Sequence, residues 1–206
     1  MAKLESTFKN MVLSLVVICM VAAGALAGVY ILTLDSINAQ KIQKQQAAIL
    51  AVLPEGCTIS EAEEVDGMTL YKGYIDGQWV GTAVQTQEEG FGGPQKIMVG
   101  FTPDGFIYNY EILEQTETPG LGTHIVEWFK NADKPSQNII NRAATGAFAV
   151  SKDGGDVDAI TAATISSRAF LTAINKAYSA FTNGEVEAAT GASQQQPKEE
   201  TEVTNE

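Results

Sequence analysis

Residues 158–181, "DAITAATISSRAFLTAINKAYSAF", begin with small residues and hydroxyls and continue as an apolar helical repeat. From Phe170 onward the apolar side chains recur at helical spacing, which is typical of one face of an amphipathic helix. The positions are Phe170, Leu171, Ile174, Ala177, Tyr178 and Phe181. We expect this helix to pack on a sheet and to end at Asn183-Gly184, because glycine is favoured just past helix ends.

The start of this predicted helix carries hydroxyl side chains at Thr161, Thr164, Ser166 and Ser167. A helix N-terminus leaves backbone N–H groups unpaired and carries a partial positive charge, so it can seat a phosphate. The small residues of "TAAT" (161–164) would let a phosphate come close, and the Thr164 hydroxyl could itself be esterified. Ordinary capping by Thr161 or Thr164 explains the same residues, and physical chemistry alone favours capping.

Upstream, residues 68–113 carry strand patterns interrupted by turn sequences. The run "TLYKGYIDGQWVGTAVQT" (69–86) has Asp76-Gly77 between two β-rich stretches, and "KIMVGFTPDGFIYNYEIL" (96–113) contains Pro103-Asp104-Gly105. Such sequences favour tight turns between paired strands. We therefore predict two hairpins of one antiparallel sheet.

Two loops rich in glycine and proline flank the second hairpin, "EEGFGGP" (88–94) and "ETPGLGTH" (117–124). Such loops reverse the chain or let backbone approach a ligand closely, and each taken singly is explained by chain reversal. Beyond them we predict a short helix at His124–Lys130 with Thr123 as its N-cap. A strand at Ala147–Ser151, closed by the turn "KDGG", should come next.

An apolar run without a charge covers Met11–Leu34, which is 24 residues. Because about 20 helical residues cross the hydrocarbon core of a bilayer, we predict a membrane anchor. A cleavable signal peptide is the alternative, since "AGALAG" (23–28) offers small residues for cleavage. Apolar character resumes at "VYILTL" (29–34), which favours the anchor. The N-terminal arm, residues 1–10, is short, so we expect the residues after Leu34 to be exported.

The rest of the chain divides by composition. Residues 35–54 are rich in helix formers and end at Pro54, which predicts a helical stalk. Residues 55–184 should form the exported domain, and residues 185–206, with almost no large apolar residue, are predicted to be disordered. The net charge of −12 includes −8 in residues 35–184. An acidic exported domain argues against nucleic acid and anionic lipid as partners.

Several catalytic chemistries find no support in the sequence. His124 is the only histidine, so we expect neither a metal site nor a serine-hydrolase triad with Ser166 or Ser167. Cys19 lies in the apolar run and Cys57 beyond it, which excludes an intramolecular disulfide and a metal-binding pair.

Three segments, taken together, resemble a known family: "GFGGP" (90–94), "ETPGLG" (117–122) and "DAITAATISSRA" (158–169). Behind one N-terminal membrane helix, they closely resemble the FMN-binding domain of the G subunit of the Rnf electron-transport complex, over residues 1–183. The family's flavinylation motif is Asp-x-x-(Ser/Thr)-Gly-Ala-(Ser/Thr)-x-(Ser/Thr). It aligns here with Asp158, Thr161, Ala162, Ala163, Thr164 and Ser166.

This resemblance implies an α+β fold, an antiparallel sheet with packed helices, preceded by one N-terminal transmembrane helix. It implies FMN joined covalently through its phosphate to the side-chain oxygen of Thr164, installed by a separate flavin transferase that uses FAD. The protein would relay electrons among other membrane subunits of the Rnf complex, which links ferredoxin oxidation and NAD reduction to ion pumping. The FMN domain would lie on the periplasmic or extracytoplasmic side of the cell inner membrane.

The same resemblance assigns roles around the cofactor. Thr164 carries the phosphoester, and Thr161 with the backbone of Ala162, Ala163 and Ile165 holds the phosphate. The residues expected beside the flavin or the ribityl chain are Gly90 and Gly92 of the first loop and Gly120, Leu121, Gly122 and Thr123 of the second.

The chain departs from the family motif at Ala162, where the motif has glycine. A left-handed backbone would cost an alanine about 1–2 kcal/mol. Either the backbone at this position is α- or β-like, or the site tolerates the strain. We expect the first, and a single methyl group leaves the phosphate approach open.

Two alternatives to this assignment stay open. The covalent-FMN C subunit of the sodium-pumping NADH:quinone reductase has a similar motif and anchor, although "DAITAATISSRA" looks closer to the Rnf version. A membrane-anchored binding module without flavin would keep the fold and stay colourless even in the presence of the transferase.

Overall fold

The computed structural model describes residues 7–192, with the backbone alone for residues 184–192. The chain forms two compact units, residues 1–45 and residues 46–206. Each unit has its own architecture.

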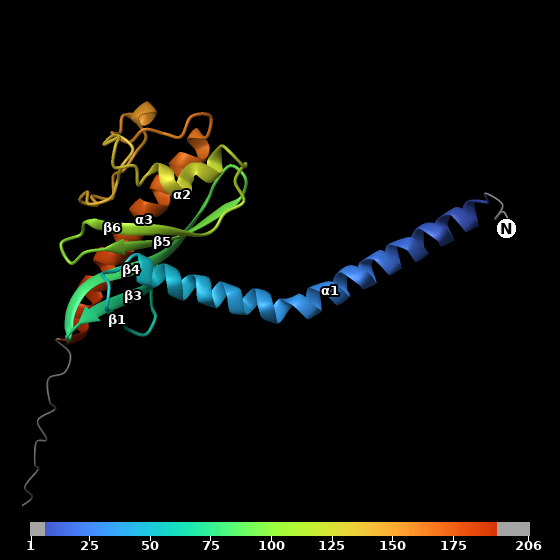
Figure 1. Ribbon diagram of the computed structural model, residues 1–206, viewed down its shortest axis with the longest axis horizontal. Helices are drawn as coiled ribbons and strands as arrows, with labels where there is room; N and C mark the ends of the chain where they lie inside the picture. Colours follow the sequence, from blue (N-terminus) through green and yellow to red (C-terminus); the bar gives the residue numbers. More distant parts are fainter. Residues whose placement is uncertain (1–6, 193–206) are drawn as a thin grey trace, which may run out of the picture. The chain divides into compact units, whose positions relative to one another are not determined.

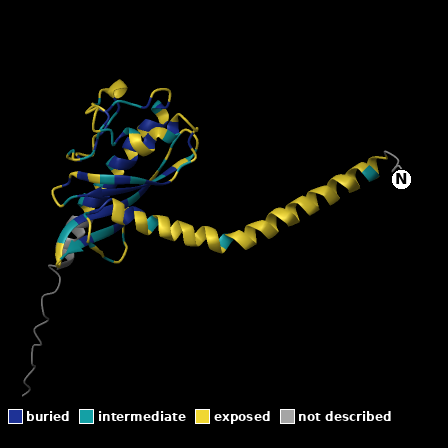
Figure 2. Ribbon diagram, viewed as in Figure 1, coloured by how far each residue is buried: buried dark blue, intermediate teal, exposed yellow. Residues whose placement is uncertain are grey.

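The first unit consists mainly of helix α1 (Phe8–Ala51), whose last turns belong to the second unit. The helix is long and apolar enough to cross a membrane, and it contains the run 11–34. Figure 2 shows this part of α1 exposed along its length. The stalk predicted at residues 35–54 continues the same helix only as far as Ala51, and from residue 46 onward it belongs to the second unit. Of the N-terminal arm predicted at residues 1–10, residues 1–6 lie outside the described residues.

The second unit is built on a six-stranded antiparallel sheet (Figure 1). The hydrogen-bonded order is β1-β3-β4-β5-β6, and β2 also pairs with β3. The strands are β1 (Thr58–Ile59), β2 (Glu63–Val65), β3 (Met68–Ile75), β4 (Gln78–Glu89), β5 (Pro94–Phe101) and β6 (Ile107–Glu114).

Both predicted hairpins are confirmed. β3 and β4 are joined at Asp76-Gly77, where both residues have positive φ, 50° and 78°. That is the conformation of a type I′ hairpin turn. β5 and β6 are joined by a turn in which Gly105 N–H donates to the Thr102 carbonyl at 2.9 Å. Local turn chemistry therefore sets these two strand pairings.

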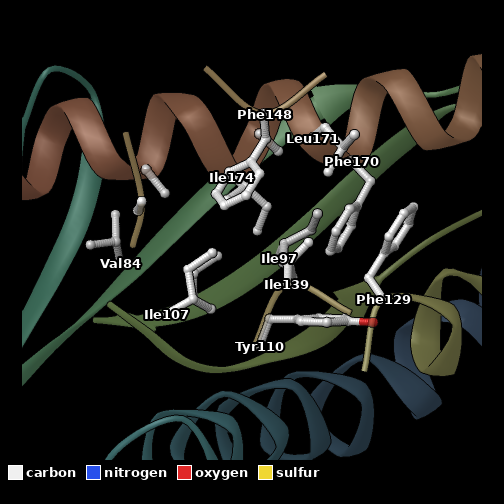
Figure 3. Packing of buried hydrophobic residues seen from close by; sticks show 14 of the residues in the cluster. Val84, Ile97, Ile107, Tyr110, Phe129, Ile139, Phe148, Phe170, Leu171 and Ile174 are labelled. Atoms are coloured by element: carbon white, nitrogen blue, oxygen red, sulfur yellow. The ribbon is translucent and has the colours of Figure 1, made fainter. Parts of the chain in front are cut away.

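Helix α3 (Thr164–Ala192) lies across one face of the sheet (Figure 1). Its predicted apolar face is packed into the core, which confirms the amphipathic helix. Phe170 stacks on Phe129 with ring centroids 4.4 Å apart, and Tyr110 meets Phe170 edge-on at 4.8 Å (Figure 3). The Tyr110 hydroxyl donates to the Ile125 carbonyl at 2.8 Å. Burial raises the pKa of Tyr110 well above its ordinary value, so the phenol stays neutral.

The other face of the sheet is covered by the end of α1. The residues of this smaller core are Ala48, Ile49, Val52, Leu53, Ala83, Met98 and Leu113. Ala83 belongs to this core and its neighbour Val84 to the core under α3, because successive side chains of a strand point to opposite faces. Asn109 Nδ2 donates to the Ala51 carbonyl at 2.9 Å, which satisfies one helix-end acceptor.

Helix α3 is longer than the sequence predicted. Asn183-Gly184 does not end it, and the helix continues to Ala192. The residues "EVEAATGA" (185–192) are rich in alanine and glutamate, and a single interior glycine costs a helix only about 1 kcal/mol. Of the tail predicted to be disordered (185–206), residues 193–206 lie outside the described residues.

Short helical elements occupy the chain between β6 and α3. They are η1 (Gly122–His124), α2 (Ile125–Trp128) and η2 (Ser151–Asp153). The helix predicted at 124–130 is thus one α-helical turn preceded by a 3-10 turn. Thr123 is not its N-cap, contrary to the prediction, because its hydroxyl accepts a hydrogen bond from Gly120 N–H at 3.0 Å.

The strand predicted at Ala147–Ser151 does not form. Phe148 instead pairs its backbone with the side-chain amide of Asn175 on α3: its N–H donates to Oδ1 and its carbonyl accepts from Nδ2, each at 2.9 Å. Val150 makes an isolated parallel bridge to Val157. A side chain distant in sequence satisfies the backbone groups that a partner strand would have paired.

Candidate functional site

A tight turn at residues 160–163 leads into α3, whose first residue is Thr164. Ala163 N–H donates to the Ile160 carbonyl at 3.0 Å and closes the turn. Ala162 has φ of 62°, so the expectation of an α- or β-like backbone there is wrong. Ala162 is the third of the four turn residues, the position at which a type II turn requires positive φ.

Replacing Ala162 by glycine is therefore expected to stabilise the protein. A left-handed alanine costs about 1–2 kcal/mol, which glycine removes. The greater freedom of glycine in the unfolded chain offsets about 0.4–1 kcal/mol, so the middle of the two ranges leaves a gain of roughly 0.8 kcal/mol. Urea unfolding followed by circular dichroism measures the difference. Ala163→Gly, at a neighbour without positive φ, is the matched control and should lose stability. A162G less stable than the parent would contradict this account.

Ser167, a buried residue, holds the turn in place. Its hydroxyl donates to the Ala163 carbonyl at 3.0 Å and accepts a hydrogen bond from Ile160 N–H at 2.9 Å. Among the described residues, neither Thr161 nor Thr164 accepts a backbone N–H with its hydroxyl. The hydroxyl that secures the entry to α3 is that of Ser167, so ordinary capping by the two threonines is not what the structure shows.

A pocket of about 370 Å³ opens beside the N-terminus of α3. Its lining residues are Phe91, Glu117, Thr118, Leu121, Gly122, Ala162, Ala163, Thr164, Ile165 and Ser166. All three segments that carry the family resemblance contribute to it. Among the site residues expected from the sequence, those that do not line it are Gly90, Gly92, Gly120, Thr123 and Thr161.

The glycines of the first loop allow it to pack closely against residues 116–117. A Cβ at Gly90 would run into the Glu117 carboxylate, and a Cβ at Gly92 would run into the Thr116 carbonyl. The Thr116 hydroxyl donates to the Gly92 carbonyl at 3.0 Å. The close approach that these glycines allow is between two segments of the chain.

Gly122 is the glycine of the second loop that lies in the pocket wall. A Cβ on it would come within 2.5 Å of Glu117 Oε2 and 2.9 Å of Ser166 Oγ, so a larger residue would displace the wall. Gly120, by contrast, faces open space and has φ of 75°, which places it in a turn. Its N–H donates to the hydroxyl of Thr123 and stabilises the loop from behind the pocket.

Four residues of the pocket lining were not among the expected site residues: Phe91, Glu117, Thr118 and Ser166. Glu117 is the charged one among them. Its side chain is buried, with 4% of the residue exposed. The carboxylate accepts hydrogen bonds from Phe91 N–H (3.0 Å), Gly92 N–H (3.3 Å), Gln95 Nε2 (2.7 Å) and Ser166 Oγ–H (2.7 Å). Hydrogen bonds to a charged group contribute about 1.5–3 kcal/mol each, which offsets the burial of the charge. Its place at the head of "ETPGLG" is the one signal that could have identified it.

One basic group, the Lys152 ammonium, lies beside the Thr164 hydroxyl. Lys152 Nζ is 3.5 Å from Thr164 Oγ1. Arg168 of α3 donates two hydrogen bonds to the carboxylate of Asp153 in η2. Its Nε bonds to Oδ2 at 2.7 Å, and one of its terminal nitrogens bonds to Oδ1 at 2.6 Å. This contact lowers the pKa of Asp153 and raises that of Arg168. It fixes the segment that carries Lys152 against the start of α3.

Asp158, the first residue of the flavinylation motif, lies outside the pocket. Its carboxylate accepts hydrogen bonds from the hydroxyls of Ser136 (2.6 Å) and Ser151 (2.9 Å), which lower its pKa. Its carbonyl accepts the indole N–H of Trp128 at 2.8 Å. Asp158 therefore ties neighbouring loops together. His124 lines a separate hollow beside Trp128.

The pocket combines backbone N–H groups that suit a phosphate with apolar side chains that suit a flat aromatic ring. Hydrogen bonding along α3 begins with Ser167 N–H to the Ala163 carbonyl at 3.0 Å, so the N–H groups of the first turn are available to an anion. Phe91 (67% exposed), Ile165 (53%) and Leu121 (40%) give the mouth apolar surfaces. The volume is within the range of roughly 300–1,000 Å³ that small-molecule sites occupy. These residues fit FMN.

Comparison with known proteins bears on the same region. The family described as the FMN-binding domain matches residues 90–179, which include the pocket. Among solved structures, the chain is similar to the crystal structure of the C subunit of Na(+)-translocating NADH-quinone reductase from Parabacteroides distasonis. The identity is 18% and the TM-score 0.49, over 72% of this chain and 95% of that chain.

Relatives named as the G subunit of the ion-translocating oxidoreductase complex match most of the chain. The protein from Haemophilus influenzae (strain PittEE) is 32% identical over 157 residues, which are 70% of this chain and 76% of that protein. The protein from Vibrio cholerae is 31% identical over 183 residues, 80% of this chain and 86% of that protein. The protein from Vibrio atlanticus is 30% identical over 188 residues, with the same coverage of 80% and 86%. This chain therefore belongs to the family of G subunits of ion-translocating oxidoreductase complexes.

Proposed function

We propose that this protein is the membrane-anchored FMN subunit of an ion-translocating oxidoreductase complex of the Rnf type. It is an electron-transfer subunit rather than a complete enzyme. The observation that carries the proposal is the place of Thr164, which begins α3, lines the pocket and lies within the FMN-binding family match at residues 90–179. FMN supplies the capacity to take up and release electrons, and the protein sets its position and electrostatic surroundings.

The attachment we propose is covalent, a phosphoester on Thr164 Oγ1. Within the described residues, Lys152 Nζ is the hydrogen-bond partner of this hydroxyl, and no acceptor engages it. No carboxylate or imidazole of the described chain hydrogen-bonds to it either, so activation falls to a separate flavin transferase. Thr161 and the backbone of residues 162–165 would hold the phosphate at the helix N-terminus.

The remaining expected residues either line the pocket or shape the loops that form it. Leu121 and Gly122 line the pocket and would lie beside the flavin or the ribityl chain. The residues that shape these loops from behind the pocket are Gly90, Gly92, Gly120 and Thr123. Covalent attachment suits an exported carrier, because a tether makes the local cofactor concentration independent of supply.

Lys152 should assist flavin attachment by balancing the phosphate charge. An exposed ion pair contributes about 0.2–1 kcal/mol, so Lys152→Gln is expected to slow attachment roughly 1.5- to 5-fold. The initial rate of flavin incorporation by purified transferase measures this, and the difference should shrink at high salt because the pair is screened. Lys72→Gln, which removes a lysine paired with Glu63 at 2.9 Å, is the control. Equal rates for K152Q and the parent would refute this role.

The topology we propose places residues 11–34 in the membrane, residues 35–54 as a stalk, and residues 55–184 as the FMN domain on the extracytoplasmic side. A helix long and apolar enough to span the membrane supports the anchor. The partners are the other membrane subunits of the complex and, during maturation, the flavin transferase.

Intact-mass spectrometry of the denatured protein, coexpressed with its flavin transferase, tests the proposal. The expected result is an added mass of one FMN less one water, mapped by peptide analysis to Thr164. Protein made without the transferase is the control and should be unmodified. An unmodified chain beside an active transferase, shown to flavinylate a known target in the same cells, would favour the binding module without flavin. Copurification with quinone-reductase subunits would instead favour the sodium-pumping alternative.

A further inference from the structure

Glu117 is the point at which the three segments of the pocket meet. Its carboxylate accepts hydrogen bonds from two backbone N–H groups of the first loop, those of Phe91 and Gly92. It also accepts a hydrogen bond from the hydroxyl of Ser166, which lies two residues after Thr164 on α3. Since Glu117 itself stands in the second loop, a single side chain sets the distance between both loops and the helix that carries Thr164.

The donors around Glu117 define its charge state. All four of its partners are N–H or O–H groups, which suit an acceptor-only, ionised carboxylate. Gln95, fully buried, turns its amide nitrogen to Glu117 at 2.7 Å and leaves its own Oε1 without a hydrogen-bond partner. The same nitrogen donates to the Ser166 carbonyl at 3.2 Å, so two acceptors, one of them Glu117, set this orientation.

No cationic side chain of the described residues pairs with this carboxylate. Across residues 7–192, no lysine, arginine or histidine forms a hydrogen bond or ion pair with Glu117. A full negative charge therefore stands in the wall of the pocket, stabilised by dipoles alone. Charges act strongly on one another in such a poorly hydrated setting.

We propose that Glu117 is a positioning residue of the flavin site, which holds the first loop and Ser166 around the pocket and whose uncompensated charge keeps the reduction potential of the flavin low. The inference rests on the proposed function. A flavin that takes up an electron gains negative charge unless a proton accompanies it, so a fixed carboxylate beside it opposes reduction. The same carboxylate holds the pocket walls together before the flavin arrives.

Glu117→Gln keeps the size and shape of the side chain and removes its charge. One of its two acceptor oxygens becomes an amide nitrogen that cannot accept from the surrounding donors, so the comparison is made on protein whose fold is verified by circular dichroism. In the full-length flavinylated protein, spectroelectrochemical titration is expected to give a higher midpoint potential for E117Q than for the parent. Flavin attachment to E117Q should be several-fold slower. Glu111→Gln is the matched control, since Glu111 pairs with Lys130 at 2.8 Å and does not line the pocket. E111Q should retain the parent potential.

An unchanged midpoint potential in folded, flavinylated E117Q would overturn the proposal. If E117Q does not fold, Ser166→Ala takes its place, because it removes one donor and keeps the charge. S166A is then expected to attach flavin more slowly than the parent at equal folded fraction, and an equal rate would overturn the proposal. Failure of the proposed function is distinguishable, since the parent protein itself would then carry no flavin.

Discussion

Thr164→Val is expected to abolish covalent FMN completely while the fold is retained. Valine replaces the hydroxyl by a methyl group at similar volume, so the helix start keeps its shape and loses the oxygen that the phosphoester requires. The hydroxyl of the half-buried Thr164 makes one long hydrogen bond among the described residues, accepted from Lys152 Nζ at 3.5 Å, so its removal should cost the fold little. Intact mass and in-gel flavin fluorescence of the protein coexpressed with its transferase measure the loss. Circular dichroism checks the fold.

Thr161→Ala is the control for this substitution. Thr161 is exposed and lies outside the pocket lining, so its removal should weaken a phosphate contact without preventing attachment. Covalent flavin that persists in T164V would show that the linked residue is another one. Complete loss of flavin in the Thr161 variant would point to Thr161 in its place.

Phe170→Ala should cause the largest loss of stability, about 3–5 kcal/mol, the usual range for removing a buried phenylalanine. Phe170 is fully buried, stacks on Phe129 at 4.4 Å and meets Tyr110 at 4.8 Å. Deleting its ring leaves a cavity between α3 and the sheet that these neighbours are too constrained to fill. Because a domain is stable by only about 5–15 kcal/mol, the variant should lie close to the unfolding threshold.

Urea unfolding of the full-length protein in detergent, followed by tyrosine and tryptophan fluorescence, measures this loss. Phe106→Ala is the control: Phe106 is 41% exposed, and its truncation should cost less than about 1 kcal/mol. Equal losses for the two variants would mean that α3 does not pack through Phe170 as described.

Much of the fold was predictable because its signals are local. Asp76-Gly77 and the turn before Gly105 specify strand reversals within a few residues, and the apolar spacing from Phe170 onward specifies a helical face. The strand expected at Ala147–Ser151 failed for the opposite reason. Its backbone partner is the side chain of Asn175, which a local pattern cannot identify.

The site divides in the same way. The family resemblance singled out Thr164, and Thr164 lines the pocket together with Ala162, Ala163, Ile165, Leu121 and Gly122, whereas Thr161 does not. The glycines at positions 90 and 92 were expected beside the ligand because glycine indicates close approach. Sequence does not say what approaches, and here it is the 116–117 segment of the same chain.

By itself, the sequence determined the hairpins, the amphipathic helix with threonine and serine hydroxyls at its start, and the apolar span before them. Only the tertiary structure decided that Ala162 is left-handed, that Ser167 secures the turn, and that Glu117 joins both loops to α3. The physical reason is the separation in sequence between the groups that interact. Turn and helix preferences act between near neighbours, whereas the energy of a buried carboxylate depends on donors that folding brings together from up to 49 residues away.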